Sequence, residues 1–248
     1  MAPDPFNTAA EPALTSGAGG TVTLVAGGTF CLSDATGDVA PGAAHGLFFS
    51  DARLLSRWQL RLDGRVPHAL TVAHPEAFAA RFVLRRPPAA GQADSTLLLV
   101  RERLVGDGMR ETVSVHNLDR EATVVRLDLH VAADFADLFA VKEGRAADGG
   151  ARSTAGDGEL VVRAGALGVS VRATAEPTVE PGTLSWRVVV PAGQRWSTEI
   201  VVSPTGNGRP VRPRFERGEP WEDTEPAREI RAWRAATTTV STADPVLA

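Results

Sequence analysis

The chain has 248 residues and a net charge of −4, with 30 acidic residues against 25 arginines and a single lysine. A chain of this length buries roughly 70–75% of the surface that its unfolded form exposes, so it can fold without disulfide cross-links. Cys31 is the only cysteine, which excludes a disulfide framework and a thiolate metal site. The arginines are scattered among acids, so the charge distribution excludes a nucleic-acid partner.

The N-terminal segment differs in composition from the rest of the chain. Residues 1–20 are rich in Ala, Pro, Gly and Thr and predict a disordered leader. They lack the positive flank and apolar run of a secretory signal. No stretch of the sequence approaches the roughly 18 apolar residues of a membrane helix. We therefore expect a cytoplasmic protein with no membrane partner.

From Thr21 onward the hydrophobic period is two, which is typical of half-buried strands. TVTLV and TFCLS flank a Gly27-Gly28 turn and predict a hairpin. In RWQLRL, residues 57–62, the apolar side chains share one face and the polar ones share the other. Leu97 to Val100 is apolar on both faces, which predicts a central strand covered on both sides.

Two further strand pairs follow the same pattern. Strands at 109–116 and 122–131 flank a turn at 117–120. Near the end of the repeating pattern, strands around Trp186 and Trp196 flank a Pro-Ala-Gly-Gln turn. At least ten short strands with no helical period between them predict an all-β, antiparallel β-sandwich. We assign it to residues 21–204.

Residues 205–248 read as a linker followed by one short helix. Thr224 is the predicted N-cap of that helix. Ala227, Ile230 and Trp233 form a narrow apolar stripe at helical spacing, and such a stripe needs a surface to pack on. Ile230 and Trp233 are therefore candidate docking residues.

A glycosidase needs two carboxylates facing each other across a cleft. The best local candidates are Asp134 and Asp137 in ADFADLFAV. Their (i, i+3) spacing directly after a strand favours turn and capping roles, because Asp accepts hydrogen bonds from nearby backbone N–H groups. We assign no catalytic residue.

The segment SDATGDV, residues 33–39, begins like a calcium loop. It lacks the glycine and the acid that an EF-hand requires, because Val39 and His45 occupy those positions. An Asx-type turn at Asp34 is the favoured interpretation. The five histidines show no ligand spacing, so we expect no metal site and no cofactor.

Asp51 and Arg53 stand two residues apart, just before the strand at 57–62. In extended chain they share one face, close to a run of large apolar residues. Charges beside such residues must be paired or hydrogen-bonded if they are buried. The pair is either a corner that fixes how the strand begins, or part of an interface or sugar cleft.

Sugar-binding modules present exposed aromatic platforms. This chain has no tyrosine, and Trp58, Trp186 and Trp196 fall on the predicted inward faces. Trp221 and Trp233 lie in the C-terminal tail, where packing on a neighbour is an equal alternative. The signal for a free-standing carbohydrate-binding module is weak.

Three stretches carry a family resemblance: FCLSDATGDVAPGAAHGLFFSDARLLSRWQLRLDG, RERLVGDGMRETVSVHNLDREATVVRLDL and ADFADLFAVKEG. Together they resemble the N-terminal domain of bacterial glycogen-debranching-type amylo-alpha-1,6-glucosidases. The family's Asp-Thr-Arg-Phe-Leu-Ser motif reads here Asp-Ala-Arg-Leu-Leu-Ser at residues 51–56. The likeness is close over about residues 22–145 and rests on strand pattern beyond them.

The resemblance implies a supersandwich-like β-domain joined through a helix to a helical toroid that carries the catalytic acids. Only fifteen residues follow Trp233, so we expect this chain to be the non-catalytic part, with the C-terminal toroid and α-glucan as its partners. Asp51, Arg53, Asp134 and Asp137 are then candidate interface or sugar-cleft residues. The alternatives are an independent carbohydrate-binding module, a protein-interaction scaffold, and a sugar epimerase or mutarotase, for which the histidines are too few.

Overall fold

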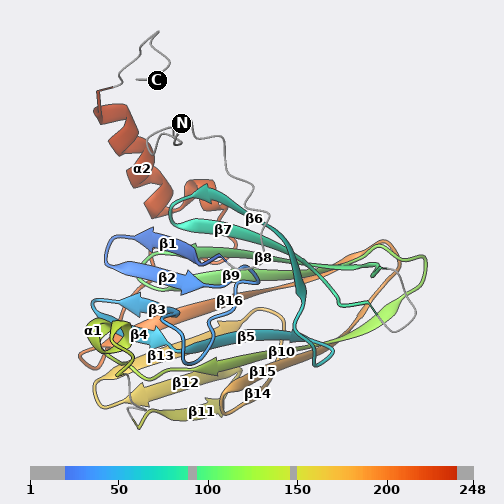
Figure 1. The fold of residues 1–248 in the computed structure, drawn as a ribbon, viewed down its shortest axis with the longest axis horizontal. Helices are drawn as coiled ribbons and strands as arrows, with labels where there is room; N and C mark the ends of the chain where they lie inside the picture. Colours follow the sequence, from blue (N-terminus) through green and yellow to red (C-terminus); the bar gives the residue numbers. More distant parts are fainter. Residues whose placement is uncertain (1–19, 89–93, 146–149, 239–248) are drawn as a thin grey trace, which may run out of the picture.

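The computed structural model describes residues 20–88, 94–145 and 150–238, and these form a mostly β structure (Figure 1). The predicted all-β antiparallel architecture is confirmed. The predicted leader, apart from Gly20, lies outside the described residues.

One sheet of nine strands, here called the large sheet, forms the first layer. Its order is β11-β12-β13-β16-β9-β8-β7-β6, with β17 paired to β16. The strands are β6 (His68–Glu76), β7 (Ala79–Arg85), β8 (Leu97–Val105), β9 (Met109–Asn117), β11 (Arg152–Gly156), β12 (Glu159–Ala164), β13 (Leu167–Ala173), β16 (Arg195–Gly206) and β17 (Arg209–Pro210).

Two sheets of four strands pack on the large sheet. The first small sheet has the order β1-β2-β3-β4, and the second has the order β14-β15-β10-β5. β1 and β2 contact β8, whereas β15 contacts β9 and β16. Their strands are β1 (Val22–Ala26), β2 (Thr29–Ser33), β3 (Gly46–Phe49), β4 (Ala52–Leu55), β5 (Arg57–Leu62), β10 (Thr123–Ala132), β14 (Thr178–Glu180) and β15 (Thr183–Val190).

The core lies between these layers and follows the predicted alternation. The predicted hairpin forms, with Ala26 opposite Thr29 across its turn. The apolar residues of β5 and the alternate apolar residues of β10 are buried: Trp58, Leu60, Leu62, Val125, Leu127, Leu129 and Val131. Asp128, which alternates with these buried residues on β10, is only 8% exposed and accepts hydrogen bonds from Arg126 and Ser185.

The turns at 117–120 and 191–194 connect strands of different sheets. β9 pairs with β8 and β16 in the large sheet, whereas β10 pairs with β5 and β15 in the second small sheet. The side-chain amide of Asn117 donates to the carbonyls of Glu121 at 2.8 Å and Val190 at 3.0 Å. This amide therefore links the β9–β10 connection to the β15–β16 connection.

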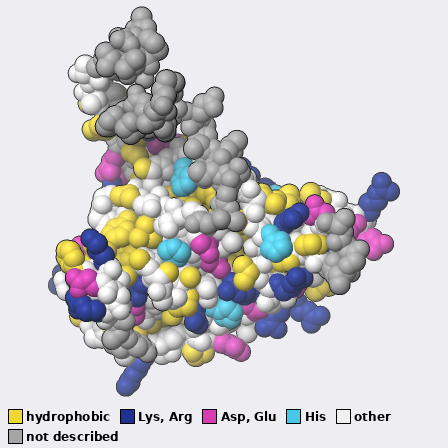
Figure 2. Space-filling view, viewed as in Figure 1, with side chains coloured by type: hydrophobic (Ala, Val, Ile, Leu, Met, Phe, Trp, Pro, Cys, Tyr) yellow, Lys and Arg dark blue, Asp and Glu magenta, His cyan; other side chains and the backbone are white. Residues whose placement is uncertain are grey.

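Three short helices complete the described residues: α1 (Leu138–Lys142), the 3₁₀ helix η1 (Trp221–Asp223) and α2 (Glu225–Ala236). α2 projects from one end of the sandwich (Figure 1) and confirms the predicted C-terminal helix. No helix among the described residues is long and apolar enough to cross a membrane. On the face in Figure 2, arginines and acidic groups are interleaved between apolar and uncharged areas.

Candidate functional site

The four candidate interface or sugar-cleft residues lie close to one another at one corner of the sandwich, where the β3–β4 turn meets the segment between β10 and α1. The backbone N–H of Arg53 donates to the carbonyl of Ala136 at 2.9 Å. The N–H of Leu138 donates to the carbonyl of Asp51, also at 2.9 Å. Asp134 and Asp137 belong to this second segment, so the chain brings both acids to the turn.

Arg53 pairs with Asp134 and not with Asp51. Its Nε donates to Asp134 Oδ1 at 3.0 Å, and its Nη2 donates to Oδ2. Its Nη1 donates to the carbonyls of Ala43 at 3.3 Å and His45 at 3.2 Å. A Cβ at residue 46 would come within 2.7 Å of Arg53 Cδ, so Gly46 leaves room for the arginine. The guanidinium group is held on three sides.

The two exposed acids of this corner have backbone roles. Ser50 and Asp51 form the two-residue turn between β3 and β4, with φ angles of 46° and 69°. Positive φ at both positions is what a type I′ hairpin turn requires. Asp137 is the N-cap of α1 and accepts hydrogen bonds from the N–H groups of Phe139 at 2.8 Å and Ala140 at 3.4 Å.

The apolar stripe of α2 runs from the core to the surface. Ala227 is buried and Ile230 packs on the core, but Trp233 is 66% exposed. Thr224 occupies the N-cap, yet its hydroxyl donates to the carbonyl of Trp221 at 2.7 Å and caps no helical N–H group. The predicted N-cap position of Thr224 is therefore confirmed, although the preceding 3₁₀ turn takes its hydroxyl.

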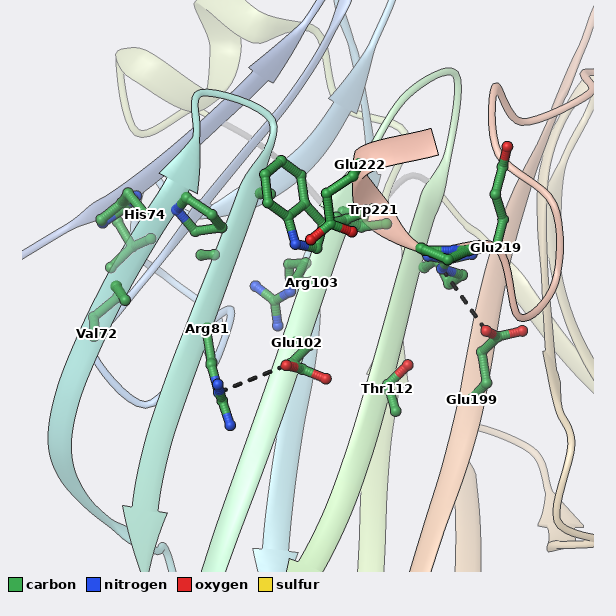
Figure 3. Close-up of a pocket in the computed structure, with 18 of the residues that line it drawn as sticks. Val72, His74, Arg81, Glu102, Arg103, Thr112, Glu199, Glu219, Trp221 and Glu222 are labelled. Atoms are coloured by element: carbon green, nitrogen blue, oxygen red, sulfur yellow. Dashed lines mark hydrogen bonds and ion pairs between the residues drawn. The ribbon is translucent and has the colours of Figure 1, made fainter. Parts of the chain in front are cut away.

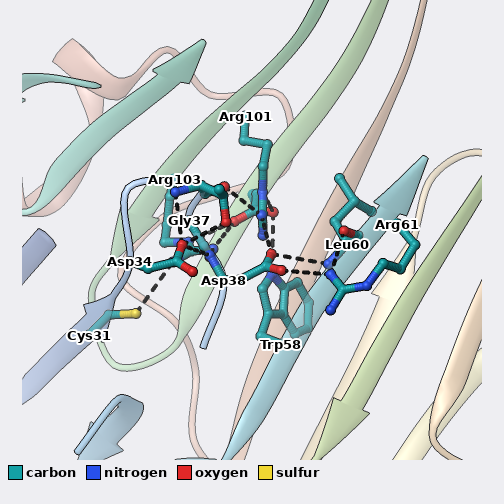
Figure 4. Close-up of polar contacts among 11 residues, drawn as sticks. Cys31, Asp34, Gly37, Asp38, Trp58, Leu60, Arg61, Arg101 and Arg103 are labelled. Atoms are coloured by element: carbon teal, nitrogen blue, oxygen red, sulfur yellow. Dashed lines mark hydrogen bonds and ion pairs between the residues drawn. The ribbon is translucent and has the colours of Figure 1, made fainter. Parts of the chain in front are cut away.

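A buried ionic network, absent from the sequence-based prediction, joins the layers beneath the 33–39 loop (Figure 4). Glu111 accepts from Arg101 Nε at 2.9 Å and from Arg103 Nε at 2.6 Å. Arg101 Nη1 also donates to Asp38 Oδ1 at 2.6 Å, and Arg61 Nη1 donates to Asp38 Oδ2 at 2.9 Å. The loop is thereby fixed from below by side chains of β8 and β5.

Charges of opposite sign compensate one another in this network. The side chains of Arg101, Arg103, Glu111 and Asp38 are at most 5% exposed. Burial would raise the pKa of the Glu111 carboxyl, but the adjacent Arg101 and Arg103 guanidinium groups outweigh burial and hold that pKa below its ordinary value. Glu111 therefore stays ionised.

A groove of about 1140 Å³ opens on the outer face of the large sheet (Figure 3). Its floor carries Arg81, Glu102, Thr112 and Glu199, and Trp221 of η1 lines the groove beyond one end of this row. Arg81 Nε lies 3.6 Å from Glu102 Oε1. Sequence reasoning assigned no role to these floor residues, and the four candidate interface or sugar-cleft residues are not among the groove's lining residues.

A model of the N-terminal domain of some glycogen debranching enzymes matches residues 24–201. That range covers well over half of the sequence, and the chain belongs to this family. The resemblance carried by the three motifs is thereby confirmed.

No curated protein matches the sequence significantly. Among solved structures, the chain is similar to a protein assigned as a kojibiose phosphorylase from the human microbiome, at 11% identity and a TM-score of 0.40. The match covers 84% of this chain but 28% of that one, so the chain spans less than a third of that protein's length. It is also similar to a galactose mutarotase-like protein from Clostridium acetobutylicum, at 8% identity and a TM-score of 0.47, over 75% of this chain and 95% of that one.

Proposed function

We propose that this chain is the non-catalytic N-terminal β-sandwich of a glycogen-debranching-type glycoside hydrolase. In this role it packs on a helical catalytic domain and helps shape the cleft for α-glucan. The observation that carries the proposal is the family match over residues 24–201, since members of that family are N-terminal domains of some glycogen debranching enzymes.

The structural engagement of three of the chain's acids supports a non-catalytic role. Glycoside hydrolysis needs one carboxyl that stays protonated near neutral pH and a second that is ionised across a cleft. Asp134 is held by Arg53, and Asp137 caps α1. Glu111 is buried and ionised between two arginines. These acids stabilise the sandwich.

Two exposed apolar side chains mark the surface that we assign to the catalytic domain. Phe139 of α1 is 63% exposed beside Asp51 and Asp137, and Trp233 of α2 is 66% exposed. Exposed aromatic residues framed by polar groups are typical of protein interfaces. Trp233 lies on the predicted docking helix, and Phe139 lies on α1, which the sequence analysis did not predict as a helix.

The test is to mix the chain with a separately produced helical catalytic domain from a debranching enzyme that carries this type of N-terminal domain. We expect a complex by titration calorimetry, and no glucose release from glycogen by the chain alone. F139A and W233A should each raise the Kd about tenfold, because each removes a central apolar contact.

Leu118 supplies the matched control. It is 62% exposed but lies before β10, at the end opposite to α1, so L118A should leave the Kd unchanged. Glucose release by the chain alone, or no complex with the catalytic domain, would contradict the proposal.

A further inference from the structure

The groove on the large sheet has a floor built from one continuous cross-strand row. Arg81 of β7 is opposite Glu102 of β8, Glu102 is opposite Thr112 of β9, and Thr112 is opposite Glu199 of β16. Neighbouring strands lie about 4.8 Å apart, so the row spans roughly 14 Å. Directly opposite residues share one face of a sheet, and Figure 3 shows these four side chains in a line across the four strands.

The walls of the groove are apolar where the floor is polar. Trp221 packs on Phe78 with ring centroids 6.3 Å apart, which fixes the indole while leaving it partly exposed. Val72 and Leu104 add apolar surface to the same lining. A fixed aromatic wall beside a row of hydrogen-bonding groups suits a ligand with apolar faces and hydroxylated edges.

The size and charge of the groove further restrict the class of ligand that it can bind. Its volume of about 1140 Å³ exceeds the roughly 300–1,000 Å³ of pockets for single small ligands. Its lining carries three arginines and four glutamates, so it offers no excess positive charge for phosphate: Arg81, Arg103, Arg110, Glu102, Glu199, Glu219 and Glu222. A neutral oligomer fits these properties better than an anion.

We propose that this groove binds a segment of neutral α-glucan chain, with Trp221 stacking on a sugar ring and the Arg81–Glu102–Thr112–Glu199 row bonding its hydroxyls. The inference rests on the proposed function for its ligand class, and it adds a binding site that belongs to this domain itself. Arg81 and Glu102 are each more than half exposed, so their groups are free to turn toward a ligand.

The experiment is calorimetric titration of the 248-residue chain with maltoheptaose and with maltose. We expect maltoheptaose to bind and maltose to bind at least tenfold more weakly, because only the longer sugar covers the row. The double variant E102A/T112V should raise the Kd for maltoheptaose at least tenfold while leaving the thermal midpoint near that of the parent.

The control double variant E159A/S170A removes a carboxylate and a hydroxyl from the same face of the large sheet, outside the groove lining. Glu159 pairs with Arg172 at 2.9 Å, much as Glu102 pairs with Arg81. Its affinity for maltoheptaose should equal that of the parent. Absence of maltoheptaose binding, or equal weakening in both double variants, overturns the inference.

The catalytic-domain titration separates this inference from the proposed function. If the chain forms a complex with the catalytic domain but does not bind maltoheptaose, the proposed function is supported and the groove site is wrong. If the chain binds maltoheptaose but forms no complex with the catalytic domain, the groove site is supported and the proposed docking on the catalytic domain is wrong. If E102A/T112V weakens only the complex with the catalytic domain, the groove is a protein interface and the inference is wrong.

Discussion

Arg53 holds a corner of the sandwich with its whole guanidinium group. Two of its nitrogens bond the Asp134 carboxylate, and the third bonds the carbonyls of Ala43 and His45. Asp134 is 81 residues away in sequence, so the pair fastens β4 to the segment that follows β10. Arginine suits this position because its planar fork satisfies a carboxylate and carbonyls together.

Replacing Arg53 tests that role. R53M should lower the free energy of unfolding by about 3 kcal/mol, because it leaves the Asp134 carboxylate, whose side chain is 13% exposed, without its partner. Urea unfolding at pH 7 measures the change. The exposed Arg57 is the control, and R57M should change the stability by less than about 0.5 kcal/mol. Equal effects at both positions would show that Arg53 has no special role.

The turn beside Arg53 offers a stabilising change. Asp51 has a φ of 69°, a conformation that glycine adopts without the steric cost that a Cβ carries. D51G should therefore raise the free energy of unfolding by about 0.5 kcal/mol, since Gly is preferred at the second position of a type I′ turn. Thermal unfolding provides the measurement, and a lower midpoint would mean that the Asp51 side chain stabilises the turn by another route.

Single residues with local partners could be predicted from the sequence, but those with distant partners could not. The Asx turn at Asp34 is confirmed, because Asp34 Oδ1 accepts from the N–H groups of Thr36 at 2.8 Å and Asp38 at 3.0 Å. That turn depends only on residues within four positions of Asp34. The Arg53–Asp134 pair depends on which strands meet, which no local pattern contains.

At the scale of elements, β8 and β9 carry charges where their alternation predicts a core. Arg101 and Arg103 are in phase with the buried Leu97 and Leu99, and Glu111 is in phase with the buried Val113. The period of two thus contained the signal, since two arginines and one glutamate at inward positions must be paired with one another. The network holds the 33–39 loop in place through Asp38.

Removing the central acid of the network should be costly. E111Q leaves Arg101 and Arg103 buried with a neutral partner, and we expect the free energy of unfolding to fall by about 3–5 kcal/mol at pH 7. E159Q, in the more exposed ion pair with Arg172, should cost about 0–1 kcal/mol. Urea unfolding compares the two.

The stability difference between the parent and E111Q should depend on pH. Because Arg101 and Arg103 lower the pKa of Glu111 despite its burial, the stabilisation is fully present above the ordinary glutamate pKa of about 4.3. It is lost as the pH falls through the lower pKa of the folded state. The stability difference between parent and E111Q should therefore shrink on acidification below about pH 4, and a constant difference would assign the effect to packing.

At the scale of the whole molecule, alternation defined the faces of the strands but not their partners. The turns at 117–120 and 191–194 are as short as hairpin turns and contain typical turn residues, yet each carries the chain from one sheet to another. The difference lies in side chains such as Asn117, whose amide bonds carbonyls that are 73 and 4 residues away. Likewise, the groove floor takes one residue from each of four strands, so its residues show no spacing in the sequence.

The position of β16 has a consequence for the growing chain. β16 is the last long strand in sequence, but it lies in the middle of the large sheet, between β13 and β9. Until residues 195–206 leave the ribosome, β9 and β13 each keep an open edge, and open edges invite pairing with other chains. The large sheet therefore closes only once synthesis has passed β16, and a nascent chain stalled before that strand is the form most in need of a chaperone.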